Sequence, residues 1–201
     1  MTAAARAAPP VPAIDMPEAL LSPRLRLRRV TRDDLPDLLA VNGDDEVTRF
    51  LPYATWQSSV DGESWFQRMM ALTTSTGGVQ MVLQSLATGR VIGTCLLFRH
   101  ESVSLRAEVG YVLGRAHWGQ GYMSEALRAL LDHALGAGGL RRIEAEIDSH
   151  NDASNAVARR LGFALEGRLR QRWTGKGRTY DTLLYGLLRD DWTGATRGRP
   201  D

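Results

Sequence analysis

A single cysteine, Cys95, provides all the thiol chemistry of this 201-residue chain. One cysteine can form no intrachain disulfide and excludes any cysteine-rich metal site. Cys95 lies inside an apolar run, which favours a small buried hydrophobe over a nucleophile. The four histidines are scattered without the spacing of metal ligands, so we expect no bound metal.

Lysine is almost as scarce as cysteine, because Lys176 is the only one and arginine carries nearly all the positive charge. The formal net charge of +2 is too small to indicate a nucleic-acid partner. No run of basic residues is interleaved with aromatic ones, as it would be along a nucleic-acid-binding surface. We therefore expect no nucleic acid among the partners.

Long apolar runs are also missing. No segment approaches the roughly 18 consecutive apolar residues of a membrane span, and the first residues lack the apolar stretch of a signal peptide. We expect no membrane partner and a cytoplasmic location. Residues 1–20 are rich in alanine and proline without periodicity, which indicates a flexible lead-in. We expect one domain over residues 21–193 and a flexible polar tail over residues 194–201.

The hydrophobic pattern predicts alternating strands and helices, typical of a mixed α/β sheet domain. The clearest helix begins near Tyr122, with apolar residues spaced at i, i+3, i+4, i+7 and i+8. The expected strands are 24–28, 79–86, 90–98, 109–113, 142–148, 163–173 and 179–188. The expected helices are 31–42, 59–72, 122–135 and 153–161.

The segment between the strand at 109–113 and the helix at 122 predicts an anion site. Gly119 and Gly121 lie in this turn, and residues without a Cβ let the backbone approach a bulky diphosphate closely. The first amides of a helix have no internal partners and sit at the positive end of its dipole. A phosphate group can accept hydrogen bonds from these amides and is attracted by the positive end of the dipole.

Two other nucleotide sites that use glycine turns fit poorly. A dinucleotide-binding dehydrogenase needs a third glycine where this chain has Ser124. A Walker loop needs a Ser or Thr directly after its lysine, but Gly177 follows Lys176.

Three motifs occur in order along the chain: Ala116-His-Trp-Gly-Gln-Gly121, Asn151-Asp-Ala-Ser-Asn155 running into Arg160-Leu-Gly-Phe163, and Leu183-Leu-Tyr-Gly-Leu-Leu188 before Asp191-Trp192. Together, over residues 23–192, they resemble the GCN5-related N-acetyltransferase (GNAT) superfamily, and within it the branch that acetylates ribosomal-protein N-termini. One departure is Ala116, where the family signature has Gln or Arg. Arg115 is the neighbouring candidate for the missing side-chain contact.

This resemblance implies an α/β fold with a single mixed, mostly antiparallel sheet of six to seven strands flanked by about four helices. It implies direct acetyl transfer from acetyl-CoA, as donor cosubstrate, to a primary amine, most simply a protein N-terminus. A small amine (a polyamine, an antibiotic or an amino-acid derivative) is the alternative acceptor. A non-catalytic acyl-CoA-binding module is the alternative class of function. A monomer and a homodimer both fit.

The resemblance also implies which residues bind the cofactor. The turn and helix start would hold the pyrophosphate, and the strand before the turn, splayed from its neighbour, would pair with the pantetheine arm. The helix after residue 150 would contribute amide side chains, although Asn151 is equally suited to capping that helix. The full set is Tyr111, Val112, Leu113, Trp118, Gly119, Gln120, Gly121, Tyr122, Met123, Ser124, Asn151 and Asn155.

Acetyl transfer needs a base for the amine, a donor to the oxyanion and a proton for the departing thiolate. The resemblance implies Ser154 as the thiolate's proton donor and the amide of Val112 or a near neighbour at the oxyanion. Glu108 is the best carboxylate for the base, if its pKa is raised or a water relays the proton. Its alternative role is that of an ordinary strand-end residue.

Overall fold

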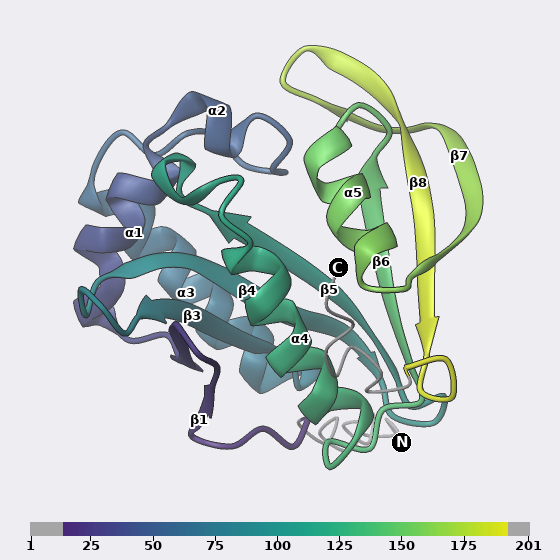
Figure 1. Ribbon diagram of the computed structural model, residues 1–201. Helices are drawn as coiled ribbons and strands as arrows, with labels where there is room; N and C mark the ends of the chain where they lie inside the picture. The colour runs from purple at the N-terminus through teal and green to yellow at the C-terminus, as the bar shows by residue number, and fades with distance from the viewer. Residues whose placement is uncertain (1–13, 193–201) are drawn as a thin grey trace, which may run out of the picture.

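The computed structural model describes residues 14–192. One sheet of eight strands forms its centre, in the order β1-β2-β3-β4-β5-β6-β8-β7 (Figure 1). Neighbouring strands are antiparallel except for β5 and β6, which run parallel. The strands are β1 (Ala19–Leu21), β2 (Leu25–Arg29), β3 (Val79–Ser85), β4 (Val91–Glu101), β5 (Arg106–Leu113), β6 (Arg142–Asp148), β7 (Ala164–Gly175) and β8 (Arg178–Leu188).

Five α-helices and two 3-10 turns connect these strands in the described range. The helices are α1 (Leu35–Asn42), α2 (Asp45–Thr48), α3 (Ser59–Thr76), α4 (Tyr122–Leu135) and α5 (Asp152–Arg160), and the turns are η1 (Arg32–Asp34) and η2 (Arg115–His117). Local capping fixes where the first helices begin. Thr31 and Asp34 form a capping box before α1, and Ser58 and Asp61 form another before α3.

The predicted mixed, mostly antiparallel sheet is confirmed, but six to seven strands and four helices were too few. The extra strand is β1, only three residues long, and the extra helix is α2, with four. Elements this short show no hydrophobic period, so the pattern could not reveal them.

The beginning of the domain differs from the expected lead-in over residues 1–20. Residues 1–13 lie outside the described range, but Ile14 and Met16 are buried against the main core at 3% and 8% exposure. Strand β1 pairs with β2 directly afterwards. The expected tail at 194–201 also lies outside the described residues, and the domain bounds otherwise stay a prediction.

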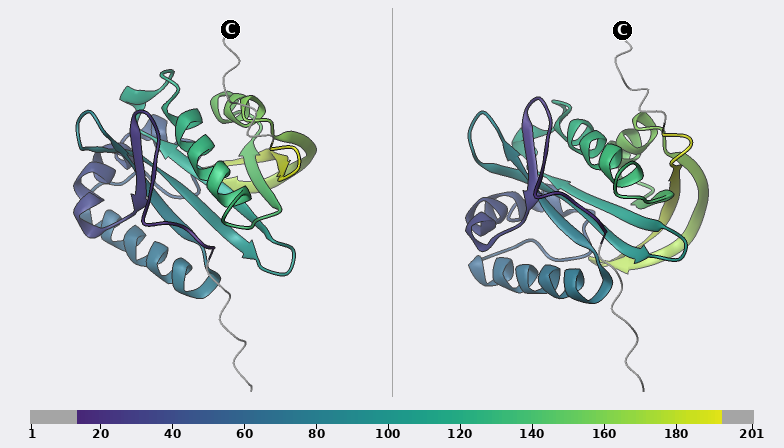
Figure 2. Two further views of the ribbon diagram at one scale, coloured as in Figure 1. Left: turned by 60° about the horizontal axis from the view of Figure 1, so that its bottom comes forward. Right: turned by 90° about the horizontal axis from the view of Figure 1, so that it is seen from below.

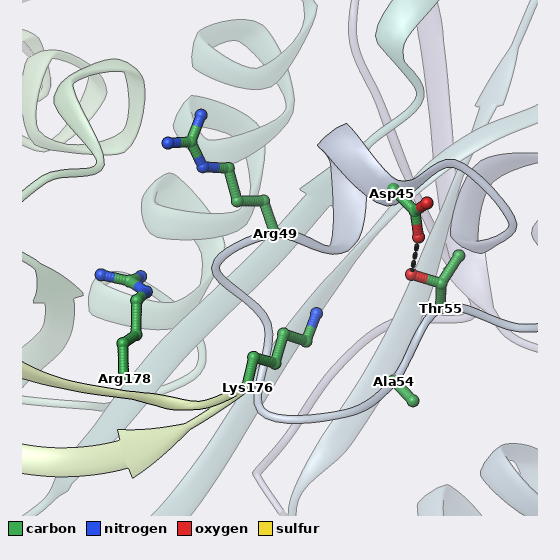
Figure 3. A pocket seen from close by; sticks show the side chains of 6 residues that line it. All are labelled: Asp45, Arg49, Ala54, Thr55, Lys176 and Arg178. Atoms are coloured by element: carbon green, nitrogen blue, oxygen red, sulfur yellow. Dashed lines mark hydrogen bonds between the residues drawn. The ribbon is translucent and has the colours of Figure 1, made fainter.

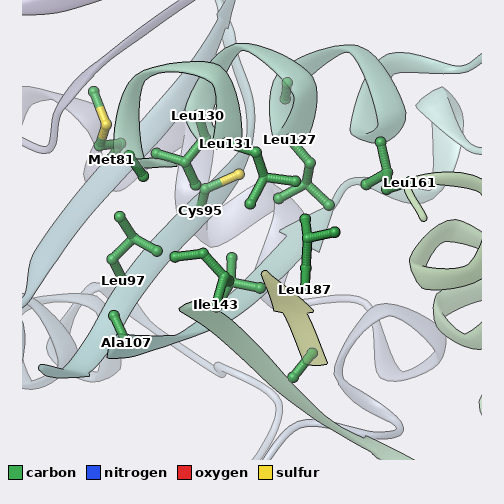
Figure 4. Close-up of a cluster of buried hydrophobic side chains, with 14 of the residues drawn as sticks. Met81, Cys95, Leu97, Ala107, Leu127, Leu130, Leu131, Ile143, Leu161 and Leu187 are labelled. Carbon is green, nitrogen blue, oxygen red and sulfur yellow. The ribbon is translucent and has the colours of Figure 1, made fainter. Parts of the chain in front are cut away.

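The main core lies between the sheet and α4. Leu127, Leu130 and Leu131 of α4 face Cys95 and Ile143 of the sheet (Figure 4). Cys95 is fully buried, and burial raises the pKa of its thiol, so its predicted role as a small hydrophobe is confirmed. Odd-numbered residues of β5 and β6 face this core, because side chains alternate along a strand.

Helices α1 and α3 cover the opposite face of the sheet, so α3 and α4 lie on opposite sides of it (Figure 2). A second cluster fills this side, in which the rings of Trp56 and Trp65 lie 5.6 Å apart between centroids. Even-numbered residues of β5 and β6 point to this face.

Candidate active site

The glycine turn after β5 has the predicted shape. Gly119 and Gly121 have φ angles of 70° and 78°, in the left-handed region where glycine carries no penalty. A Cβ at Gly119 would meet nothing within 4 Å, so the protein itself needs glycine there for conformation and not for space. The open space above the turn is available to a ligand.

The amides of this turn are free in the described part of the chain. Gly119, Gln120 and Gly121 donate no backbone hydrogen bond there. Gly121 is the N-cap of α4 and no side chain caps the helix, so the amides that follow have no partner one turn back. The side-chain amide of Gln120 donates to the carbonyl of Ala116 at 2.8 Å. The turn therefore presents backbone donors at the positive end of a helix.

Arg24, which sequence reasoning missed, supplies the cation beside the turn. Its Nη1 donates to the carbonyl of Gln120 at 3.0 Å, its Nε pairs with Glu125 at 2.6 Å, and its guanidinium lies 4.1 Å from the ring centroid of Tyr122. Arg115, the expected substitute for the residue missing at Ala116, instead pairs with Asp44 at 2.7 Å. Arg24 lies 96 residues before Gln120 in the sequence, so no local spacing indicated it.

Strands β5 and β6 separate just before the turn. Their parallel pairing covers only three residue pairs and ends at Glu108 with Glu144. Beyond this point β5 keeps its pairing with β4, and β6 keeps its pairing with β8. The facing edges of the two strands are therefore unpaired, and the predicted splay is present.

The register decides which backbone groups face the splay. Gly114 donates to the carbonyl of Ile92 on β4, so alternation directs the N–H and C=O groups of Val112 to β4 as well. Those of Tyr111 and Leu113 point toward the splay. The carbonyl of Leu113 accepts a 2.7 Å bond from the indole of Trp118, which fastens the turn to the strand end. The register thus favours Tyr111 over Val112 for backbone contact with a ligand.

Helix α5 lies along the other side of the splay. The Asn151 side chain accepts from the amide of Ser154 at 3.1 Å, so it serves as the helix cap. The Tyr111 hydroxyl donates to the carbonyl of Ser154 at 3.2 Å and ties α5 to β5. Asn155 is 2% exposed and donates to the carbonyl of Asp148 at 3.2 Å, while its buried Oδ1 has no partner in the described residues. That oxygen can therefore accept a hydrogen bond from a ligand.

Two predicted cofactor residues at the start of α4 point into the protein. The Met123 side chain is 6% exposed in the main core, so only its amide can serve a ligand. The Ser124 hydroxyl is buried and accepts a weak 3.4 Å bond from Arg160. Tyr122 is half-buried beneath Arg24.

Glu108 lies where the two strands separate and is only 7% exposed. The pKa of its carboxyl is raised to about 7, chiefly because burial disfavours the charge. The nearby Glu146 and Glu144 also raise this pKa, and Arg99 lowers it. Arg99 donates to Glu108 at 2.6 Å and to Glu146 at 3.1 Å, and thus bridges β5 and β6. A carboxyl that changes protonation near neutral pH is suited to act as a general base.

Two β-bulges, which the pattern did not reveal, direct side chains to these carboxylates. The pairing of β4 shifts between Phe98 and Glu101, and Arg99 there has φ of 49°. The pairing of β7 shifts before Trp173, whose indole donates to Glu146 at 3.2 Å. Bulges commonly redirect side chains beside active sites. The arrangement gathers residues of β4, β5, β6 and β7 around the splay.

Neither a metal cluster nor a membrane helix is found between residues 14 and 192. No group of three or more His, Cys, Asp or Glu residues in this range could hold a metal ion. None of the helices there has the length and apolar character needed to cross a bilayer.

Comparisons with known proteins agree with this geometry. The acetyltransferase (GNAT) domain family matches residues 24–164. The uncharacterized N-acetyltransferase p20 of Bacillus licheniformis is 32% identical over 177 residues, which cover 88% of this chain and 99% of p20. The ribosomal-protein-serine acetyltransferase of Escherichia coli is 44% identical over 100 residues, covering 50% of this chain and 56% of that protein.

A solved structure shares the fold throughout. It is RimL, a ribosomal L7/L12 alpha-N-protein acetyltransferase in complex with coenzyme A, with a TM-score of 0.78 and 26% identity. The similarity covers 87% of this chain and 99% of the RimL chain. With the family match spanning the glycine turn, the splay and α5, the chain belongs to the GNAT family of acyl-CoA-dependent N-acetyltransferases.

Proposed function

We propose that this protein transfers the acetyl group of acetyl-CoA directly to a protein N-terminal amine. The observation that carries the proposal is the splay between β5 and β6, with the buried carboxyl of Glu108 on one face of β5 and α5 on the other. A thioester held between the strands would have a base on one side and Ser154 on the other.

The residues present suit acetyl-CoA. The free amides of residues 119–121, followed by the first amides of α4, are donors for a pyrophosphate. The unpartnered Oδ1 of Asn155 is an acceptor for an amide N–H, which the pantetheine arm contains. Acetyl-CoA supplies an already activated thioester, so the reaction needs no covalent enzyme intermediate.

The proposed chemistry assigns one task to each group. Glu108 takes a proton from the substrate ammonium, and the freed amine forms the new C–N bond at the thioester carbonyl carbon. A backbone N–H at the splay, for which the register favours Tyr111, donates to the oxyanion. As the C–S bond breaks, the Ser154 hydroxyl gives its proton to the sulfur. The nitrogen, now bonded to the carbonyl carbon, loses its second proton to solvent, which reprotonates Ser154, and Glu108 releases the first proton to solvent after the product leaves.

The acceptor is inferred from relatives that act on ribosomal proteins. The Escherichia coli protein is a ribosomal-protein-serine acetyltransferase, and RimL acts on the α-amine of L7/L12. Glu108, the proposed base, and its charged neighbours lie on the face opposite α4, where an extended N-terminus could approach. These observations support a peptide amine as the acceptor.

The test measures thiol release with three groups of amines. The first is unblocked peptides that begin with Ser or Ala, the second is the same peptides with an acetylated N-terminus and an internal lysine, and the third is small amines. We expect turnover only in the first group, and Glu108→Gln should reduce it roughly 100-fold or more. Turnover of small amines alone would overturn the proposal. Silence with every amine, while acetyl-CoA still raises the Tm, would indicate a non-catalytic module instead.

A further inference from the structure

A cationic hollow lies between α2 with the segment that follows it and the β7–β8 hairpin (Figure 3). Its volume is about 450 Å³. It is lined by Asp45, Arg49, Ala54, Thr55, Lys176 and Arg178. The only lysine of the chain is therefore one of its three cations.

Two of the three cations, Arg49 and Lys176, form no close ion pair in the described range, whereas Arg178 pairs with Asp148. The Arg49 side chain is 63% exposed, and its nearest carboxylate, Glu46, is 3.8 Å away, beyond hydrogen-bond distance. The Lys176 ammonium donates to the carbonyl of Thr48 at 2.5 Å, which uses one of its three N–H donors. The one acid of the lining, Asp45, accepts a 2.5 Å bond from Thr55 and also favours the charged form of Lys176, so it neutralises that ammonium in part.

Arg178 lines the hollow and also contacts the end of β6, which borders the splay. Its Nη2 bonds Asp148, the last residue of β6, and its remaining donors bond no other residue of the described range. Its guanidinium lies 4.6 Å from the Tyr180 ring centroid and 5.4 Å from that of Phe50. Arg49 lies 5.2 Å from the Phe50 ring, so this ring supports both guanidinium groups. Two pre-placed guanidinium groups with unused donors suit a carboxylate.

The hollow and Glu108 lie on the same face of the sheet. Glu108 pairs in register with Glu144 on β6, and Asp148 follows Glu144 on the same side of that strand. Four strand residues span roughly 13 Å, about the length of three to four residues of an extended peptide. A peptide whose amine lies at Glu108 can thus bring its third or fourth side chain to the hollow.

We propose that this hollow binds a carboxylate of the acceptor, so that the protein prefers N-termini with an acidic side chain at the third or fourth position. The inference rests on the proposed function and adds a substrate class to it. The acceptor then matches the charge pattern of the face: its ammonium meets the carboxylates of the splay, and its acidic side chain meets the cations.

The experiment compares three peptides that differ only at positions three and four, where they carry Glu, Gln or Lys. Initial rates with saturating acetyl-CoA give kcat/KM for each. We expect the Glu peptide to exceed the Gln peptide about fivefold, as for one exposed charge pair, with the Lys peptide slowest. The preference should shrink at high salt, because exposed charges are screened.

Charge reversal at the hollow provides the matched comparison. Arg49→Glu should remove or invert the preference, and Lys176→Gln should weaken it. Arg32→Glu is the control, since Arg32 is also 63% exposed but pairs with Glu63, and neither residue lines the hollow. A Tm increase with acetyl-CoA shows that each variant is folded.

Two results would contradict the inference in distinguishable ways. Equal kcat/KM for the three peptides, or an unchanged preference in Arg49→Glu, overturns the carboxylate site and leaves the proposed function standing. Failure to acetylate any peptide, with acetyl-CoA binding intact, overturns the proposed function and this inference with it.

Discussion

The guanidinium of Arg99 lies 2.6 Å from the carboxylate of Glu108, and a β-bulge in β4 places it there. The same nitrogen lies 3.1 Å from Glu146, so one cation serves two strands that have just separated. Arg99 therefore favours the charged form of a carboxyl that its surroundings otherwise keep protonated.

The pH dependence of acetyl transfer should report this pair. In the wild type, kcat/KM should rise with pH and level off above about 7, where Glu108 becomes charged. In Arg99→Gln the inflection should move to higher pH by about one unit, because the opposing cation is gone and the acids Glu144 and Glu146 remain. Arg99→Lys keeps a positive charge, so its inflection should lie between those of the wild type and Arg99→Gln.

Arg32→Gln serves as the control for this profile, since it breaks an exposed ion pair with Glu63 away from the site. An inflection at the same pH in Arg99→Gln would show that Arg99 does not lower the pKa of Glu108.

Glu108 should also make stability depend on pH. The fold raises the pKa of its carboxyl from the ordinary 4.5 to about 7, so the folded state favours the protonated form. The stability gained in this way is fully present below about pH 4.5 and is lost as the pH rises through 7. Glu108→Gln stays uncharged, so its stability relative to the wild type should increase by about 2 kcal/mol between pH 5 and pH 8.

Urea denaturation at these two pH values measures the difference. Glu63→Gln is the comparison, because hydrogen bonding from Gln67 lowers the pKa of Glu63 and no such increase is expected. A difference for Glu108→Gln that does not change with pH would contradict a raised pKa.

Ser154→Ala tests the proposed proton donor. We expect kcat to fall roughly 100-fold, while the affinity for acetyl-CoA changes little, because the backbone of Ser154 still bonds Asn151 and Tyr111. Single-turnover rates and the acetyl-CoA-induced Tm shift separate the two effects. An unchanged kcat would remove Ser154 from the mechanism.

The glycine turn can be tested with an internal control. Gly119 and Gly89 share φ of 70°, and a Cβ added to either would meet nothing within 4 Å. Alanine at either site should therefore cost a similar 1–2 kcal/mol of stability, roughly the penalty for a left-handed residue. Only Gly119→Ala should weaken acetyl-CoA binding, since its methyl group would stand over the amide-lined turn. An equal Tm shift with acetyl-CoA in both variants would exclude this turn from the cofactor site.

The sequence was informative wherever a structural role follows from local chemistry. The spacing of leucines after Tyr122 predicted α4 and its buried face, because a helix repeats every 3.6 residues. The glycines at 119 and 121 predicted the turn, because a left-handed backbone favours glycine. The pattern also predicted β6 with its observed bounds, 142–148.

The sequence could not reveal contacts that depend on register or on bulges. Arg24 reaches the turn from across the sheet, and Arg99 reaches Glu108 only because a bulge redirects it. The direction of the Val112 amide depends on which residue of β4 lies opposite it. Each of these is a tertiary relationship for which no spacing along the chain is diagnostic.

The bond between Arg24 and the carbonyl of Gln120 joins residues 96 positions apart. The proposed acetyl-CoA site is therefore complete only when the hairpin of β1 and β2 has docked at the sheet edge. Ligand affinity and the local stability of that edge are then linked: binding should slow amide hydrogen exchange in β2, and loosening the edge should weaken binding. Ligand binding at a motif of a few consecutive residues thus depends on the assembly of the whole domain.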